Sequence, residues 1–392
     1  MNFDQVIDRH HTYCTQWDFV QDRFGVAGLL PFTISDTDFA VPDEVNTILK
    51  QRLEHPVFGY TRWNHNDFKV SVIDWYENRF KTNIKTEWIQ YSPTVIYSVS
   101  KLIQLISAEN SGVVLQTPAY DAFYQVIKAN KRKLVENPLI YKNLTYQIDF
   151  LDLEEKLAQP ENQVMLLCSP HNPTGRVWTK AELEKIVSLC QKYQVFLIVD
   201  EIHMDVLRRQ VEYIPILSIT QTQVAALSSG TKTFNFPGLV FSYALLPDNE
   251  LHENFATVLK AQDGLSSASI LGMLATMTAY NKCGYWVESL KKYIDENIQY
   301  TEEFLQREVP EIKVVPSQAT YLMWLDISDS GISMTRLQDV LVHKGKVAIM
   351  DGKVYGGNGE QFLRFNVGCP RSKVIEGLQR LKYSIDSIED RA

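Results

Sequence analysis

Three residues could act together on a carbonyl group or an amine: Asn172, Asp200 and Lys232. Lys232 belongs to the segment 226–233, whose small and hydroxylated residues are untypical surroundings for a solvated surface lysine. A lysine amine that loses solvation can attack an aldehyde and form a Schiff base. Taken singly, however, an aspartate at a strand end more often caps a helix or forms a surface ion pair, and Asn-Pro-Thr-Gly is more often a turn. The three residues can act together only if the fold brings them to one place.

The elements around these residues predict a strand, helix, strand unit. The apolar run 164–169 predicts a buried strand. His171–Gly175 is predicted to form a loop, because Asn-Pro and Gly break regular structure. Thr179–Glu182 fits a capping box, and helical spacing follows in Leu183, Ile186, Val187 and Cys190. A second buried strand, 195–199, ends at Asp200. Such units build parallel sheets with ligand sites at the carboxyl ends of the strands, so Asp200 is predicted at such a site.

An earlier unit offers a second binding feature. Residues 88–91 predict a short strand, and a helix should begin near Thr94, just after Ser92-Pro93. The first-turn amides of Thr94, Val95 and Ile96 would have no partners within the helix, so they could bind a phosphate. By itself this signal is weak, since nearly every α/β protein has such helix starts.

The C-terminal third predicts a separate α+β domain that begins near residue 288. A long helix should stop before Pro310, a strand should span 320–325, and Ser372 should open a final helix. No repeat, low-complexity tract or linker marks a domain boundary.

Composition narrows the class of protein. The 392 residues carry 39 Lys and Arg against 47 Asp and Glu, a net charge of −8 without a basic run, which argues against nucleic acid as a partner. The longest apolar stretches are far shorter than a membrane helix, and no secretory signal is visible. Five scattered cysteines predict reduced thiols in the cytoplasm, and no histidine or cysteine spacing predicts a metal site.

Taken together, the motifs resemble a known family. The sequence is similar to the fold-type I pyridoxal-phosphate enzymes, and within them to the cystathionine β-lyases of the maltose-regulon-modulator type, which resemble class I and II aminotransferases. The matching segments are Leu30–Asp36, Gln116–Tyr124, Ser169–Gly175, Asp200–His203, Ser229–Lys232, Val347–Met350 and Arg364–Asn366. The resemblance covers nearly the whole chain. It implies an α/β, aspartate-aminotransferase-like fold with a large cofactor domain (50–287), a mostly parallel sheet and a small domain (1–49 and 288–392).

The resemblance also implies a role for each matching residue. Lys232 would bind pyridoxal 5'-phosphate covalently and then transfer protons. Asp200 would pair with the protonated ring nitrogen and keep the ring an electron sink, while Asn172 would donate to the phenolic oxygen. Tyr120 would stack on the ring, and Arg364 would hold the substrate α-carboxylate in a bidentate pair.

For the cofactor phosphate, the resemblance implies the amides of Val95 and Ile96 and the hydroxyl of Ser229. Tyr60 matches a tyrosine that reaches the phosphate of the neighbouring subunit, so a homodimer is expected. Where many relatives have tyrosine, His203 offers a ring nitrogen that titrates closer to neutral pH.

Three positions depart from the family pattern. Val240 stands where aminotransferases of this group usually carry a phosphate-binding arginine. Asp351 replaces a common proline and Thr37 a common methionine, so the loops over the substrate side chain are expected to differ. The departures at Thr37 and Asp351 bear on the choice of thioether substrate more than on the reaction type, whereas at Val240 the phosphate charge must be met by other groups.

Three functions remain open from the sequence. A β-elimination enzyme would convert an amino-acid thioether into a thiol, pyruvate and ammonia. An aminotransferase on the same scaffold would instead keep the amino group and need a second substrate. A regulatory protein would bind a transcription activator through its surface, and this role could coexist with the first.

Overall fold

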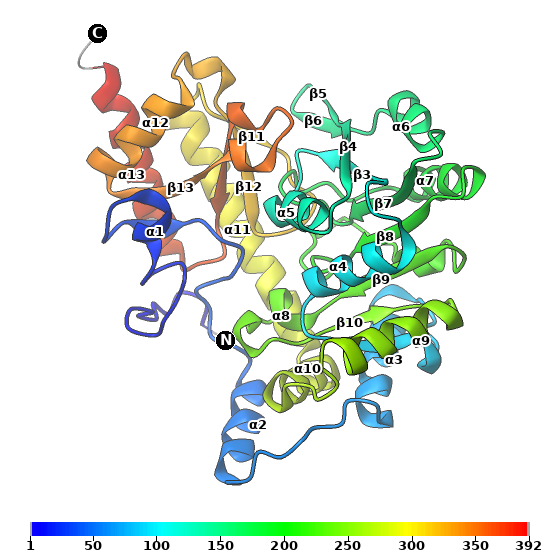
Figure 1. The fold of residues 1–392 in the computed structure, drawn as a ribbon. Coiled ribbons are helices and arrows are strands. Elements are labelled where there is room, and N and C mark those ends of the chain that lie inside the picture. The colour runs from blue at the N-terminus through cyan, green and yellow to red at the C-terminus, as the bar shows by residue number, and fades with distance from the viewer. Residues whose placement is uncertain (1, 390–392) are drawn as a thin grey trace.

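The computed structural model describes residues 2–389, and its centre is a seven-stranded, mostly parallel sheet (Figure 1). Strand β10 alone runs antiparallel to both of its neighbours. In spatial order the strands are β2 (Ile89–Ser92), β10 (Ser242–Leu245), β9 (Val224–Ser228), β8 (Phe196–Asp200), β7 (Asn162–Cys168), β3 (Gly112–Thr117) and β4 (Lys133–Pro138). The carboxyl ends of the parallel strands therefore meet at one edge of the sheet.

Helices cover both faces of this sheet because its strands are apolar on both sides. Within β7, Leu166 packs on one face and its neighbours Met165 and Leu167 on the other, as the pleat requires. One face carries α4 (Val95–Ile106), α5 (Asp121–Ala129) and α9 (Asn249–Thr257). The other carries α3 (Asn66–Phe80), α6 (Phe150–Leu157), α7 (Lys180–Lys192) and α10 (Ile270–Lys282).

A second, five-stranded sheet joins the two ends of the chain. Its order is β1 (Leu30–Phe32), β13 (Val347–Asp351), β14 (Phe362–Asn366), β12 (Leu322–Asp326) and β11 (Lys313–Val315). The N-terminal strand β1 pairs in parallel with β13. With this sheet lie α11 (Gly284–Glu308), α12 (Met334–Val340) and α13 (Arg371–Glu389). The shorter elements are α1 (Val20–Phe24), α2 (Asp43–Glu54), α8 (Gly230–Thr233), β5 (Ile140–Lys142) and β6 (Thr145–Gln147).

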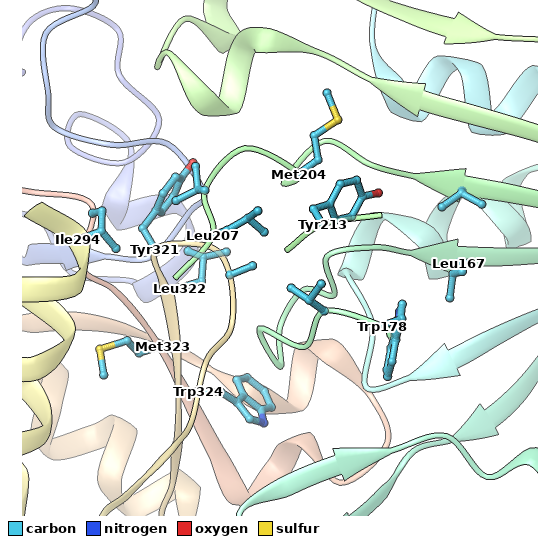
Figure 2. Packing of buried hydrophobic residues seen from close by; sticks show 14 of the residues in the cluster. Leu167, Trp178, Met204, Leu207, Tyr213, Ile294, Tyr321, Leu322, Met323 and Trp324 are labelled. Carbon is cyan, nitrogen blue, oxygen red and sulfur yellow. The ribbon is translucent and has the colours of Figure 1, made fainter. Parts of the chain in front are cut away.

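One apolar core connects the two sheets. Figure 2 shows Leu167 and Trp178, on the side of the large sheet, in the same cluster as Met323 and Trp324 of β12. Ile294 of α11 packs into this cluster as well. The small sheet is thereby fixed against the large one, close to the carboxyl edge where β7 and β8 end.

The elements expected from sequence are present, with small shifts at their ends. The capping box at Thr179 and Glu182 is formed, and Thr94 caps α4 through a hydrogen bond from Tyr97 N at 3.0 Å. The strand expected over 320–325 begins only at Leu322, because Thr320 adopts a positive φ of 70° that interrupts extended structure. The α/β fold is confirmed, whereas the boundaries at residues 50 and 288 fall inside α2 and α11 and stay a prediction.

Among residues 2–389, no helix has both the length and the apolar composition that crossing a membrane requires.

Candidate active site

A cavity of about 230 Å³ opens at the carboxyl edge of the large sheet. It lies beyond the ends of β7, β8 and β9, where parallel sheets place their ligands. Eight of the residues predicted from sequence line it: Val95, Ile96, Tyr120, Asn172, Asp200, His203, Ser229 and Lys232. The fold thus assembles in one place side chains that lie up to 137 residues apart in the chain (232 − 95).

Lys232 is held in the short helix α8 immediately after β9. Ser229 caps this helix by accepting a hydrogen bond from Thr231 N at 3.1 Å. The Ser229 hydroxyl also lies 2.6 Å from the carbonyl oxygen of Phe241, so it is engaged within the protein. Burial lowers the pKa of the Lys232 amine, and the Arg364 guanidinium lowers it further, against the opposing charges of Asp36 and Asp200. A lysine with a lowered pKa carries more of the neutral, nucleophilic amine.

Asp200 ends β8 as a buried carboxylate. Its Oδ1 accepts one hydrogen bond, from Ile202 N at 3.0 Å, and no ion pair engages it among the described residues. Burial raises its pKa to about 6, against the Ile202 amide and the charge of Lys232. A cation placed in the cavity would restore the ionised form, because opposite charge favours ionisation.

The next residue, Glu201, is buried on the other side of the chain. Its Oε1 accepts from Ile216 N at 2.8 Å, and Oε2 accepts from the hydroxyl of Tyr76 on α3 at 3.4 Å. Burial raises the pKa of Glu201 to about 7. Asp200 lines the cavity and Glu201 does not. The two adjacent carboxylates therefore have different surroundings, and only that of Asp200 is available to a ligand in the cavity.

We expect Glu201→Gln to make the protein more stable than wild type above pH 7. The folded pKa of about 7 lies above the ordinary 4.5, so the folded chain binds the proton more tightly and loses stability as pH rises between these values. The glutamine avoids that loss while keeping the Oε1 acceptor. Urea unfolding at pH 4 and pH 8 measures the free energy of unfolding of both proteins. The variant's free energy of unfolding minus that of wild type should be larger at pH 8 than at pH 4. An equal difference at both pH values would contradict the assignment.

Asn172, which lines the cavity, is hydrogen-bonded to Arg364, which does not itself line it. Arg364, on β14, donates from Nη1 to Asn172 Oδ1 at 3.1 Å and from Nη2 to the carbonyl oxygen of Thr33 at 2.7 Å. The guanidinium carbon lies 4.7 Å from the centre of the Tyr355 ring. Both side chains are buried, and the Arg364 Nε atom has no hydrogen-bond partner in the part of the chain that the structure describes. A buried guanidinium with a donor to spare suits a carboxylate ligand.

The expectation that His203 titrates closer to neutral pH is wrong. Burial, together with the nearby charges of Lys232 and Arg364, lowers its pKa to about 3. His203 is therefore a neutral imidazole at physiological pH. Its Nδ1 atom is buried without a hydrogen-bond partner among the described residues.

The end of the cavity where the resemblance places a phosphate has few charged groups. Lys232 is the only cationic side chain among its described lining residues, and Val240 stands there with a left-handed φ of 51°. The amides of Val95 and Ile96 form the first turn of α4, at the positive end of the helix dipole. An anion bound here would be held by amides and hydroxyls.

Three residues from the sequence analysis lie elsewhere. Tyr60 is fully exposed and is not among the residues that line the cavity of its own chain. Asp351 lines a separate cavity beside Arg23. Thr37 is buried, and its amide donates to Asn235 Oδ1 at 3.0 Å.

The sequence analysis missed the residues that hold the N-terminal segment over the site. Ser35 lines the cavity, and its carbonyl oxygen accepts from the hydroxyl of Tyr321 at 2.9 Å. Asn366 donates to the carbonyl oxygens of Ile34 and Asp36, each at 2.7 Å. These contacts join residues about 300 positions apart, and no local pattern could have indicated them.

The cavity offers groups that fit pyridoxal phosphate. Within residues 2–389, Asp200 is a buried carboxylate without an ion-pair partner and His203 has a ring nitrogen without a hydrogen-bond partner, and the first turn of α4 lines the cavity. These groups match a cationic ring nitrogen, a ring oxygen and a phosphate. Together with Lys232 and the two-sheet fold, they define a pyridoxal-phosphate enzyme with the aspartate-aminotransferase-like fold, as the resemblance implied.

Comparisons with known proteins agree. Residues 27–381 match the family "Aminotransferase class I and II", and the chain belongs to this family. It is 42% identical over 387 residues to "Protein MalY" of Escherichia coli, covering 99% of each chain. It is 36% identical over 388 residues to "Cystathionine beta-lyase PatB" of Bacillus subtilis, covering 98% of this chain and all of that one. The crystal structure of cystalysin from Treponema denticola, which contains pyridoxal 5'-phosphate, has a TM-score of 0.95 at 30% identity and covers 99% of both chains.

Proposed function

We propose that the protein is a pyridoxal-phosphate-dependent carbon–sulfur β-lyase that cleaves cystathionine or another S-substituted cysteine. The products are a thiol, pyruvate and ammonia. The observation that carries the proposal is Lys232, an amine with a lowered pKa that shares a buried cavity with Asp200. A full-length relative at 36% identity is a cystathionine β-lyase, which supports the choice of reaction.

The cofactor, when bound, supplies an electron sink for a carbanion at the substrate Cα. Asp200 would hold the ring nitrogen, and Asn172 and His203 would contact the ring oxygen. Tyr120, half-buried at the start of α5, would lie against the ring face. Val95, Ile96 and Ser229 would hold the phosphate, which requires the Ser229 hydroxyl to turn away from the Phe241 carbonyl oxygen and donate to a phosphate oxygen.

Two residues would act on the substrate: one binds its carboxylate and the other transfers its protons. Arg364 would take the α-carboxylate, and its hydrogen bonds to the Thr33 carbonyl oxygen and to the side-chain oxygen of Asn172 keep the guanidinium plane fixed. The Lys232 amine removes the Cα proton and delivers a proton to the departing sulfur. Both steps need an amine that is neutral at one moment and protonated at the next, which a lowered pKa favours.

The lining of the cavity favours a lyase over an aminotransferase for dicarboxylic amino acids. Arg364 would be committed to the α-carboxylate, and the described residues that line the cavity include no arginine for a second carboxylate. An unpaired carboxylate is costly to bury, so a neutral or zwitterionic thioether is the better ligand. The test is the product balance with an S-substituted cysteine as the sole substrate: thiol, pyruvate and ammonia should appear together.

We also propose a homodimer in which Tyr60 reaches the cofactor phosphate of the neighbouring subunit. Val57, Phe58 and Tyr60 expose their side chains in one extended segment. An apolar segment in solvent is typical of a contact surface. Tyr60 is left fully exposed by its own chain, and a second copy is the partner that we propose covers it.

Mixing Tyr60→Phe with Lys232→Ala subunits should restore activity. A mixed dimer has one site with the native lysine of one subunit and the native tyrosine of the other. If the two variants are mixed in equal amounts and pair at random, about a quarter of all the active sites in the mixture have both native residues. The mixture is unfolded and refolded together, and thiol release is compared with that of each variant refolded alone. Activity no higher than the average of the two variants would show that Tyr60 does not serve the other subunit.

The cellular setting is a proposal as well. All five cysteines are free and buried, which suits the reducing cytoplasm. The expected contact with a transcription activator stays a prediction from the sequence resemblance.

A further inference from the structure

A second and larger cavity, of about 770 Å³, adjoins the cofactor cavity. Ser35, Tyr120, Lys232 and Pro237 line both. Much of the remaining lining of the second cavity comes from the N-terminal segment that lies over the site. Lys232 therefore stands where the two cavities meet.

Asp36 lines the second cavity with a carboxylate that is only half paired. Its Oδ2 atom accepts from Arg9 Nη2 at 2.7 Å. Its Oδ1 atom is buried and has no hydrogen-bond partner among the described residues. Leaving a buried carboxylate oxygen without a donor costs free energy, so a donor is expected to reach it in a working state.

The neighbouring Asp38 shows what full pairing looks like. Its carboxylate accepts from Lys373 Nζ at 2.5 Å, from Arg9 Nη1 at 2.8 Å and from Trp17 Nε1 at 3.0 Å. Asp38 thus anchors the N-terminal segment. Asp36, two residues away, has an acceptor to spare.

The backbone around Asp36 is fixed, so the missing donor has to move to it. The carbonyl oxygens of Ser35 and Asp36 accept from Tyr321 and Asn366. The carbonyl oxygen of Thr37 accepts from Asn235 at 2.9 Å. These three contacts hold the segment on both sides of the carboxylate.

Among the donors that line this cavity without a hydrogen bond to a described residue, which include the Thr37 hydroxyl, only the Lys232 amine can carry a charge opposite to that of the carboxylate. The Arg9 guanidinium is engaged by Asp36 Oδ2, Asp38 and the Thr37 carbonyl oxygen, and the Tyr321 hydroxyl donates to Ser35. Lys232 has no hydrogen bond to a described residue that would keep its amine away from Asp36. Its side chain is long and flexible, so the amine can move. Burial and Arg364 lower the pKa of its amine, while Asp36 and, less strongly, Asp200 raise it.

We propose that Asp36 is a positioning residue for Lys232: when the amine is free and protonated, Nζ donates a hydrogen bond to Asp36 Oδ1. The contact points the amine toward the junction of the two cavities. It also stabilises the ammonium form, so that a proton taken by Lys232 stays on Nζ until an acceptor is in reach. This use in elimination rests on the proposed function, but the contact itself does not.

The test is the proton affinity of Lys232 in the full-length protein freed of cofactor. Acetic anhydride acylates only neutral amines, and mass spectrometry of the peptide that contains Lys232 gives the extent of labelling against pH. With Asp36→Asn, the labelling midpoint should fall by about one pH unit, since the variant removes an opposite charge near the amine. Asp36→Glu keeps the charge and should keep the midpoint within about half a unit of wild type.

The control is Asp339→Asn, which removes an exposed carboxylate on α12 and should leave the midpoint unchanged. An Asp36→Asn midpoint equal to wild type, or an equal shift in Asp339→Asn, overturns the proposal. If circular dichroism shows that Asp36→Asn does not fold, Asp36→Glu decides, because a midpoint more than one unit below wild type also overturns it.

In the holoenzyme, Asp36→Asn should move the pH profile of kcat in the same direction, with a KM change of less than about threefold. A rise in KM without a change in the pH profile of kcat would contradict a role that acts through Lys232. If wild type releases no thiol, the proposed function fails, and the labelling midpoints still decide the contact.

Discussion

Replacing Lys232 with alanine should lower thiol release from an S-substituted cysteine by at least about a thousandfold. The amine is needed to bind the cofactor covalently and to move the proton from Cα to sulfur. The fold should survive, because the change removes a buried amine that forms no ion pair with a described residue. Initial rates with and without added cofactor measure the loss, and circular dichroism checks the fold.

A matched control is Lys180→Ala, which removes an exposed lysine at the start of α7. Its rate should equal that of wild type. A Lys232→Ala rate within tenfold of wild type would end the assignment of this residue.

Replacing Asp200 with asparagine should lower kcat by about a hundredfold or more while the cofactor still binds. The amide oxygen keeps the hydrogen bond from Ile202 N, so the change removes little besides the charge. Without that charge, the ring nitrogen loses its proton and the carbanion at Cα loses its stabilisation. The visible spectrum measures cofactor content, and the kinetics of thiol release measure the rate.

The neighbouring carboxylate supplies the control for this prediction. Glu201→Gln makes the same chemical change one residue away, on the side of the chain that faces Tyr76 and Ile216. It should retain kcat within about threefold of wild type. Equal losses in the two variants would show that the loss at Asp200 does not come from contact with the ring.

Local patterns were sufficient to predict the elements that carry the site. The capping box at Thr179 and the cap at Thr94 are decided within four residues, and both are formed. The apolar run that ends in Asp200 needed no tertiary information either, because a strand buried on both faces is apolar throughout. The carboxyl-edge rule then placed Asp200 at the cavity.

Other features depend on contacts that no short segment contains. The neutral state of His203 results from its burial beside Lys232 and Arg364, which sequence spacing does not report. The hydrogen bond from the Thr37 amide to Asn235 joins residues 198 positions apart. That Asp36 Oδ1 lacks a donor can be recognised only from its burial in the folded chain. Tyr60 has no contact with the cavity of its own chain, and its use depends on a second copy.

The most direct test of the account follows the amino group of L-cystathionine in the holoenzyme, using substrate labelled with ¹⁵N at the cysteine-derived amine. Samples are run with and without 2-oxoglutarate, and the thiol, pyruvate and labelled ammonia are counted. The account predicts the three products in equal amounts at the same rate in both samples, with no label in glutamate. Product formation that requires 2-oxoglutarate, with the label recovered in glutamate, would contradict the lyase and establish an aminotransferase in its place.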